Sequence, residues 1–238
     1  MTRHIIVAKI IFRRRFKAMP LIGHRINPST SAVPAAILDA FRGAAVAVIS
    51  DNMNRLHGTR NLRPYHRSGH LVGTAVTVKT RPGDNHTLHK AYELLRPGDV
   101  LVVDGGGDRI QALVGEIMMN RAKAMGVAGF VIDGAIRDVA AFREADFPCY
   151  ARSVTHRGPY KSGPGEINVP VAIDGMVVMP GDVVVGDTDG VVTFDRADAE
   201  GLLALVREQE AREAGALTDI AEGRLDKPYT GIVEKAAS

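Results

Sequence analysis

The chain has 238 residues, enough for one full hydrophobic core, and its 45% hydrophobic and 24% charged residues are typical of a globular protein. Its apolar runs are far shorter than the roughly 20 residues that a membrane helix needs, so we expect no membrane span. Residues 1–18 hold six of the 30 lysines and arginines and no acidic residue, so the remaining chain carries 24 basic and 27 acidic side chains. The net charge of +3 therefore reflects the N-terminus, and we expect no nucleic-acid partner.

Residues 1–18 make up a basic N-terminal arm, which we expect to be disordered or to precede a true start at Met19. The apolar stretch of this arm comes before its arginines, the reverse of a secretory signal. We expect one domain over residues 19–214 and a C-terminal extension over residues 215–238 that packs on a neighbouring subunit. The single cysteine, Cys149, excludes an internal disulfide and fits a cytoplasmic location, and its apolar surroundings predict a buried side chain.

The first part of the chain alternates between helical and strand patterns. Apolar residues at helical spacing predict helices, and β-branched or continuous apolar runs predict strands. In chain order we expect a helix at 34–43, strands at 44–50 and 69–80, a helix at 86–95, a strand at 100–104, a helix at 110–125, a strand at 127–133, a helix at 137–145 and a strand at 148–154. This order is typical of βα units.

The second part of the chain is richer in strands. Residues 169–194 hold three short β-branched runs separated by Gly and Asp turns, a pattern that predicts antiparallel strands. A last helix is expected over residues 197–214. The predicted fold class is therefore α/β in a single domain, with βα units first and a β-rich segment after them.

Two patterns suggest ligand chemistry but do not complete a motif. The VVDGGGD phrase at 102–108 runs from a strand into glycines, yet it lacks the full spacing of a dinucleotide or nucleotide loop, and a tight turn is the better interpretation. The histidine pairs His66 with His70 and His86 with His89 have spacings that could serve zinc, but no cysteine or further acid completes a four-ligand set. We expect neither a nucleotide site nor a zinc site.

The phrase VGEIMM places Gly115 and Glu116 inside the helix expected over residues 110–125. A glycine in the middle of a helix costs about 1 kcal/mol relative to alanine. This cost indicates that a neighbouring strand or a ligand approaches the Gly115 backbone closely. Glu116 flanks the apolar stripe of the helix and is equally well explained as a solvated glutamate.

The phrase VIDGAIRD at 131–138 reads as the end of a strand, a glycine turn, and Arg137 beside Asp138 at the start of a helix. Ligands of βα units bind beyond the carboxyl end of the strand. Arginine suits a carboxylate and aspartate suits a hard cation such as Mg²⁺, so the pair could hold both ends of a metal-chelating oxoacid. Capping of the helix by Asp138, with a solvated Arg137, explains the spacing equally well.

These phrases resemble the RraA-like family, which includes 4-hydroxy-4-methyl-2-oxoglutarate/4-carboxy-4-hydroxy-2-oxoadipate aldolases and the regulator of ribonuclease E activity. The resemblance runs from Ser50 to Val192 and is densest in GEIM, DGAIRD and PGDVVVGDTDGV. It implies a swivelling β/β/α fold in homotrimers or homohexamers with sites between subunits. It also implies that a divalent metal, Mg²⁺ or Mn²⁺ or another, binds Asp138, and that the 2-oxoacid substrate is bound by Gly115, Glu116, Ile117, Met118 and Arg137.

The function that the resemblance implies is a metal-dependent class II pyruvate aldolase. Its substrate would be 4-hydroxy-4-methyl-2-oxoglutarate or a related 4-hydroxy-2-oxoacid, and oxaloacetate decarboxylase activity would accompany it because both reactions pass through pyruvate enolate. Arg137 would neutralise substrate charge and Glu116 would move protons through a water, so these two are the predicted catalytic residues. Asp51 and Glu213 are candidates to complete a neighbouring subunit's site. The alternative is a non-enzymatic regulator that binds and inhibits a ribonuclease.

Overall fold

The computed structural model describes residues 21–224. The predicted arm over residues 1–18 and most of the predicted extension over residues 215–238 therefore lie outside the described residues. The elements are α1 Ala35–Ala40, α2 Val46–Asn52, β1 Arg63–Pro64, β2 Leu71–Thr80, α3 His86–Ala91, β3 Asp99–Val114, α4 Glu116–Ala124, β4 Gly129–Ile136, α5 Val139–Ala145, β5 Cys149–Val154, β6 Gly165–Ile167, β7 Val171–Ile173, β8 Met176–Val178, β9 Val183–Gly186, β10 Val191–Phe194 and α6 Ala199–Ala221.

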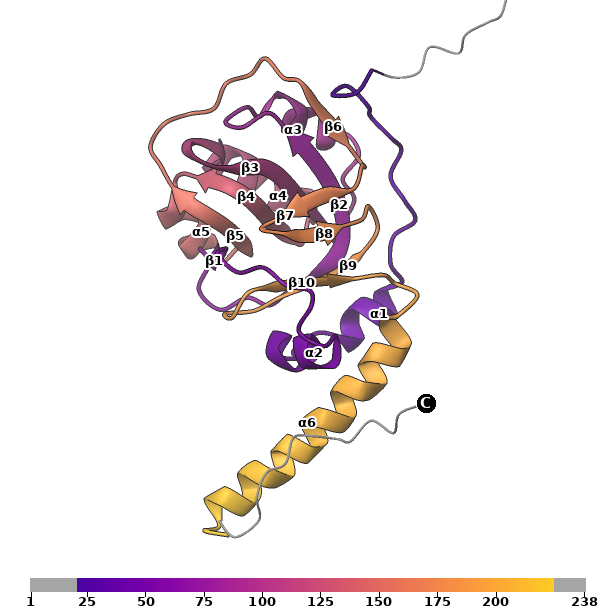
Figure 1. Cartoon of the computed structure of the whole chain (residues 1–238). Helices are drawn as coiled ribbons and strands as arrows, with labels where there is room; N and C mark the ends of the chain where they lie inside the picture. Colours follow the sequence, from indigo (N-terminus) through magenta and orange to yellow (C-terminus); the bar gives the residue numbers. More distant parts are fainter. Residues whose placement is uncertain (1–20, 225–238) are drawn as a thin grey trace, which may run out of the picture.

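One curled sheet organises the fold, with strand order β1-β5-β4-β3-β2-β9-β10 and with β6 also paired to β2 (Figure 1). Strands β2, β3, β4 and β5 are parallel, as βα units require. Strand β9 pairs antiparallel with both β2 and β10, and the β7–β8 hairpin forms a separate two-stranded sheet. The predicted α/β class, with parallel units first and antiparallel strands after them, is confirmed.

Both faces of the parallel strands are buried, which explains their continuous apolar sequences. Side chains of a strand alternate between the two faces of a sheet. Leu101 and Val103 accordingly belong to the core that includes residues of α3, α4 and α5, whereas Val100 and Val102 belong to the core formed with the β7–β8 hairpin. The buried thiol of Cys149 lies in the first of these cores, so its predicted burial is confirmed, and burial raises its pKa.

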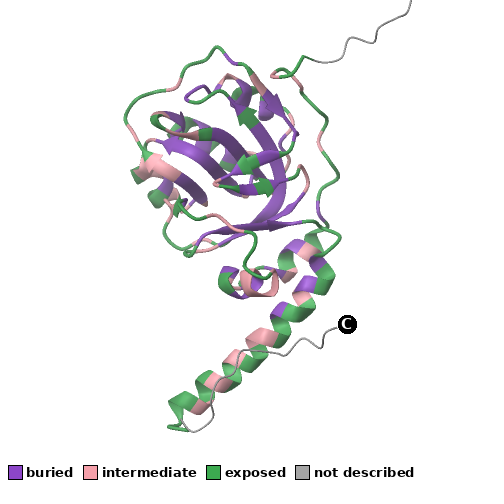
Figure 2. Cartoon of the chain, viewed as in Figure 1, coloured by how far each residue is buried: buried purple, intermediate pink, exposed green. Residues whose placement is uncertain are grey.

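A third core joins α1, α2 and the start of α6 to β9 and β10. Only the first part of α6 is covered in this way, because its buried residues are Ala199, Leu202 and Val206. The rest of α6 extends away from the sheet (Figure 1) and is largely exposed (Figure 2), including the apolar side chains of Leu217 and Ile220. Within residues 21–224, no helix is long and apolar enough to cross a membrane.

Several predicted elements are wrong in type or length, among them the helix predicted at 86–95, which ends at Ala91, and the strand predicted at 100–104, which spans 99–114. The AAVAVIS run at 44–50, predicted as a strand, lies mostly in α2, because Asp187 Oδ2 accepts the Val46 N–H at 2.8 Å and so caps the helix from far along the chain. The helix predicted over 110–125 begins only at Glu116, and residues 110–114 belong to β3. The helix predicted to end at residue 214 continues to Ala221.

The glycine-rich phrase at 102–108 lies within β3 and does not end the strand, contrary to the turn that the sequence predicts. Gly106 and Gly107 have φ values of 66° and 69°, a left-handed conformation that glycine adopts without steric cost. The pairing of β3 with β4 shifts register three times between Asp104 and Val114, where β3 bulges away from its neighbour. After the bulges Val114 pairs with Ile136, so the two strands end side by side.

A buried ion-pair network fastens the β7–β8 hairpin to the sheet. Arg152 Nε contacts Asp133 Oδ1 at 2.5 Å, and its Nη2 contacts Asp174 Oδ1 at 2.9 Å. Asp174 lies between β7 and β8 and also accepts hydrogen bonds from Arg60 and Asn61. Burial alone would raise the pKa of Asp174, but these hydrogen bonds and Arg152 lower it to about 2.

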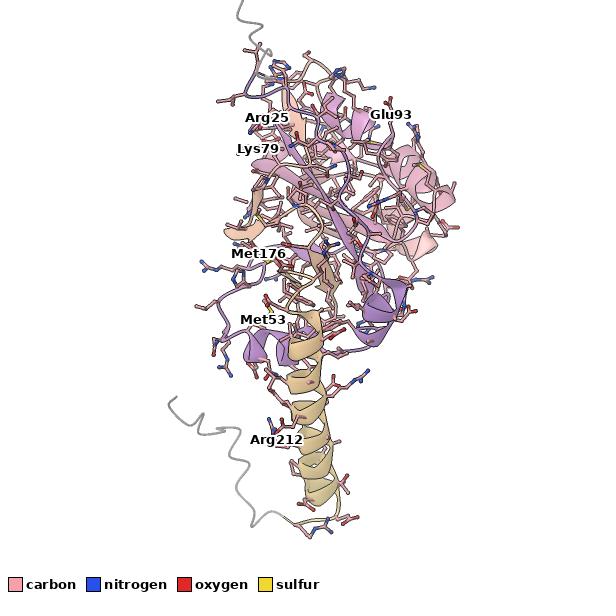
Figure 3. All side chains as sticks on the ribbon, turned by 90° about the vertical axis from the view of Figure 1, so that its right-hand side faces the viewer. Arg25, Met53, Lys79, Glu93, Met176 and Arg212 are labelled. Carbon is pink, nitrogen blue, oxygen red and sulfur yellow. The ribbon has the colours of Figure 1, made fainter. Side chains whose placement is uncertain are left out.

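The Arg152→Met variant should be strongly destabilised, because it leaves Asp133 and Asp174 buried without their cation. The expected loss is about 3–5 kcal/mol in the free energy of unfolding, measured with urea at pH 7. Arg212→Met is the control, because Arg212 lies far along α6 (Figure 3) in an exposed pair with Glu208, where the expected change is below about 1 kcal/mol. Equal small effects of both substitutions would contradict this role for Arg152.

Candidate functional site

The ends of β3 and β4 bring the two predicted motif phrases together. Val114 pairs with Ile136, and the Arg137 N–H donates to the Val114 carbonyl at 3.1 Å, so Gly115 lies beside Arg137. The glycine turn expected within VIDGAIRD is absent, since Gly134 is part of β4. Gly115 is also not in the middle of a helix, because it precedes the first residue of α4.

Asp138 has a left-handed backbone, with φ 58° and ψ 37°, which aspartate tolerates better than most residues. It stands at the N-cap of α5 but makes no side-chain capping bond there. Its Oδ2 instead accepts the Glu116 N–H at 3.0 Å, so the carboxylate caps α4, one strand away. The alternative in which Asp138 caps the helix that follows it is therefore wrong about the helix, because Asp138 caps α4 and not α5. Arg137 Nε lies 3.5 Å from the same oxygen, and both side chains are 41% exposed.

The close approach predicted at Gly115 comes from this charged pair. A Cβ atom at residue 115 would lie 2.5 Å from Asp138 Oδ2 and 3.0 Å from Arg137 Cγ. Both separations are too short for ordinary contact, so the pair can lie against the chain only because residue 115 has no side chain. Gly115 thus sets the positions of Arg137 and Asp138.

A cavity of about 290 Å³ opens next to this pair. Four of the predicted site residues line it, namely Gly115, Ile117, Met118 and Arg137, whereas Glu116 and Asp138 are adjacent to the lining. The first N–H groups of a helix have no partner within the helix. The Met119 N–H already bonds to the Gly115 carbonyl, so the N–H groups of Ile117 and Met118 are the ones that α4 leaves for a ligand.

Three further polar residues line the cavity, and no sequence pattern assigns them to this site: Asn85, His89 and Lys161. Asn85 is the N-cap residue of α3 and His89 lies in the last turn of this helix, whereas Lys161 lies in the segment between β5 and β6. In the sequence, His89 stands out only as one member of an incomplete zinc-binding pair. The signal for Lys161 was the basic residues in the glycine- and proline-rich phrase HRGPYKSGPG, which has no strand or helix pattern of its own.

The buried Asp84 carboxylate fixes the segment that carries Lys161. Its Oδ2 accepts the N–H groups of Ser162 at 2.7 Å and Gly163 at 2.9 Å, and its Oδ1 accepts the His86 N–H at 2.9 Å. Burial tends to raise the pKa of Asp84, but these backbone hydrogen bonds outweigh it and lower the pKa. Asp84 therefore acts as an anionic clamp that joins the start of α3 to the segment before β6.

The histidines form no zinc site in the part of the chain that the structure describes, and no group of three or more His, Cys, Asp or Glu residues there could hold a metal ion. His66 is occupied structurally, since its Nε2 lies 2.8 Å from the Gly69 carbonyl and its Nδ1 accepts the Cys149 N–H at 3.2 Å. His86 and His89 share α3 but face different cavities. Within residues 21–224, a metal at Asp138 would thus have at most two ligands from His, Cys, Asp or Glu side chains.

The two residues expected to serve a neighbouring subunit lie together, away from the cavity of their own chain. Gln209 on α6 donates to Asp51 Oδ2 at 3.3 Å and to Glu213 Oε1 at 2.9 Å. Asp51 belongs to α2 and Glu213 to α6, and neither helix lines the cavity.

The protein is an α/β protein built on one curled sheet. It has a small cavity, lined by the side chains of Arg137 and Lys161, beside an aspartate that caps a helix. The family model RraA-like, described as Aldolase/RraA, matches residues 46–193. The chain therefore belongs to the RraA-like family. It is 38% identical over 172 residues to a protein of Halalkalibacterium halodurans named "Putative 4-hydroxy-4-methyl-2-oxoglutarate aldolase", covering 72% of this chain and 82% of that protein.

Solved structures show the same fold. An uncharacterized protein from Pseudomonas syringae pv. tomato is 26% identical, with a TM-score of 0.73 over 82% of this chain and 96% of that one. The RNA-processing inhibitor RraA from Thermus thermophilus is 31% identical, with a TM-score of 0.59 over 64% of this chain and 93% of that one. The predicted RraA-like fold is thereby confirmed.

The Gly115→Ala variant should lose stability, because its Cβ would displace the Asp138 carboxylate. We expect a loss of about 1–3 kcal/mol in the free energy of unfolding, measured with urea. Gly215→Ala is the matched control, because a Cβ there meets nothing within 4 Å on the exposed part of α6, and a gain of about 0.5–1 kcal/mol is expected. A stable Gly115→Ala variant would contradict the crowding at this position.

The Asp84 clamp predicts a pH dependence of stability. The folded pKa lies below the ordinary value of 3.8, so the stabilisation from ionised Asp84 is complete above that value and is lost as pH falls through the folded pKa. Asp84→Asn should therefore be less stable than the wild type at pH 7, by about 1–3 kcal/mol. The gap should narrow as pH is lowered from 5 towards 2, measured by urea unfolding; a gap independent of pH would count against the clamp.

Proposed function

We propose that the protein is a metal-dependent lyase that cleaves 4-hydroxy-4-methyl-2-oxoglutarate or a related 4-hydroxy-2-oxoacid. The main observation that supports this proposal is the Arg137–Asp138 pair, which packs against Gly115 next to a small cavity. In this reaction the bond between C3 and C4 breaks, its electron pair forms pyruvate enolate, and C4 becomes a carbonyl as its hydroxyl loses a proton. Protonation of the enolate methylene completes pyruvate. Oxaloacetate decarboxylation passes through the same enolate, so we propose it as a second activity.

Arg137 binds the anionic end of the substrate in this proposal. Its guanidinium lines the cavity and can pair with a carboxylate or with the enolate oxygen as charge develops there. The unpaired N–H groups of Ile117 and Met118 add donors from the start of α4. Glu116 is exposed at the first position of α4 and would hold a water that carries protons between the C4 hydroxyl and the enolate methylene.

Asp138 is the residue that would hold the divalent metal. The residues fit such an ion, because Mg²⁺ is usually bound through one or two carboxylates and keeps several waters. The Asp138 side chain is 41% exposed. Within residues 21–224, its ion pair with Arg137 and its hydrogen bond from the Glu116 N–H both involve Oδ2. When bound, the metal would supply Lewis-acid stabilisation of the oxoacid's carboxylate and keto oxygens.

The subunits of this lyase would associate as a homotrimer or homohexamer. The apolar residues Leu217 and Ile220 are exposed along the far part of α6. A larger cavity of about 730 Å³ lies near the start of α6, next to Met53 (Figure 3). Its lining side chains are mostly apolar and include Leu56 and Leu205. Exposed apolar surface of this kind favours burial against another copy. Asp51 and Glu213 would reach the neighbouring cavity together, since Gln209 joins them.

The decisive experiment measures pyruvate release from 4-hydroxy-4-methyl-2-oxoglutarate and from oxaloacetate, with Mg²⁺ and with EDTA. We expect release that EDTA abolishes, and a loss of about 100-fold or more in kcat/KM for Arg137→Ala. Arg143→Ala on α5 is the control, because this arginine does not line the cavity. Absence of metal-dependent release from either substrate, or full activity of Arg137→Ala, would overturn the proposal.

A non-enzymatic regulator of a ribonuclease is the second candidate, favoured by the likeness to the RNA-processing inhibitor from Thermus thermophilus. Such a regulator would bind through its outer surface and would not need the Arg137–Asp138 pair. A pull-down with a ribonuclease separates the two functions. Binding that is equal in the wild type and in Asp138→Ala, together with no pyruvate release, would support the regulator.

A further inference from the structure

The cavity beside Arg137 is lined on its remaining side by residues that the reaction described above does not use. Its charged lining residues among those described are Arg137 and Lys161, and no carboxylate lines it. Two cations without a lining acid favour a ligand with more than one anionic group. Arg137 has a role at the reacting end of the substrate, so Lys161 is left with no partner in that chemistry.

Asn85 supplies a second and independent indication of a ligand. It is only 4% exposed, and its Oδ1 is buried without a hydrogen-bond partner within residues 21–224. The orientation of the amide is fixed, because Nδ2 donates to the Leu113 carbonyl at 3.0 Å. A buried acceptor that lacks a donor is costly, and the residue that carries it, Asn85, lines the cavity, so we infer that a hydroxyl group on the ligand satisfies it.

The backbone position of Lys161 does not depend on a ligand. The Tyr160 N–H donates to the Gly83 carbonyl at 2.8 Å on one side of it, and the Ser162 N–H donates to the Asp84 carboxylate at 2.7 Å on the other. The Asn85 N–H in turn donates to the Tyr160 carbonyl at 3.0 Å, so the Lys161 and Asn85 backbones are tied together. Burial, and the positive charges of Lys161 and Arg121, lower the pKa of His89, which favours neutral His89 beside Lys161.

We propose that Lys161 and Asn85 determine substrate specificity: Lys161 pairs with a second carboxylate of the substrate and Asn85 accepts a hydrogen bond from its hydroxyl. This inference rests on the proposed lyase function and assigns the residues that select its substrate. The preferred substrates are hydroxylated 2-oxo acids with two carboxylates. Lys161 and Asn85 act on binding of the half that contains C4 and is released with the new carbonyl, whereas Arg137 and Asp138 act on the half that becomes pyruvate enolate.

The test compares 4-hydroxy-4-methyl-2-oxoglutarate with 4-hydroxy-4-methyl-2-oxopentanoate, which has a methyl group in place of the second carboxylate. Lys161→Met should lower kcat/KM for the dicarboxylate about 10- to 100-fold and leave the monocarboxylate within about threefold, because only the first substrate loses a charge-assisted hydrogen bond. Lys161→Arg should restore most of the preference. Lys90→Met, a charge loss at an exposed position of α3 outside this cavity, should change neither value.

Equal losses on both substrates would overturn the assignment and indicate that Lys161 binds a separate small anion or acts structurally. An unchanged dicarboxylate preference in Lys161→Met would overturn it as well. For Asn85→Ala the informative quantity is a ratio, namely KM for the hydroxylated dicarboxylate over the inhibition constant of 2-oxoglutarate, which lacks the hydroxyl. This ratio should rise about 5- to 20-fold, whereas a general folding defect would shift both constants together.

A binding measurement separates failure of this inference from failure of the lyase proposal. Calorimetry with Mg²⁺ compares 2-oxoglutarate with 2-oxopentanoate, and the wild type should prefer the dicarboxylate by about tenfold while Lys161→Met shows no preference. If the wild type releases no pyruvate but keeps this preference, the lyase proposal fails and the specificity assignment stands. If it releases pyruvate but shows no preference dependent on Lys161, the assignment fails alone.

Discussion

The contact between Gly115 and the Arg137–Asp138 pair is the constraint on which the candidate site depends. A side chain at residue 115 would lie 2.5 Å from the Asp138 carboxylate. With glycine there, the carboxylate reaches the Glu116 N–H at the positive end of α4, and this bond offsets the cost of the left-handed backbone at Asp138. The charged pair is thus held in place by the fold before any ligand binds, which is the preorganisation that a binding or catalytic site needs.

A second constraint, the buried Asp84 carboxylate, builds the other side of the cavity. It joins the start of α3 to the segment before β6 through three backbone N–H groups. The two sides differ in origin, because Gly115 and Arg137 follow parallel strands, whereas Lys161 is held by hydrogen bonds between irregular segments. A site on strand ends and helix starts is rigid, and a loop side can change without disturbing the sheet. In this arrangement the rigid side with Arg137 would serve the reaction. The loop side with Lys161 could change and so alter which substrate binds.

The sequence predicts the parallel βα units and the pair Arg137–Asp138 because strand patterns and motif phrases are local. It fails where distant residues decide the structure. The strand predicted at 44–50 is a helix because Asp187 caps it, and the helix predicted from residue 110 starts at 116 because β3 continues through its glycines to pair with β4. Asn85 and Lys161 escape detection for the same reason: only the folded chain brings them to one cavity.

The described cavity is open on the side where chemistry on an enolate would need protection from water. Ile117 at its edge is 82% exposed, and Glu116 is exposed beside it. Within the same chain α6 extends away from the sheet and carries Glu213, tied through Gln209 to Asp51. We propose that both features have one explanation, in which α6 and α2 of one copy cover the cavity of the next. Association would then complete the site, and the long exposed helix would be the element that makes it possible.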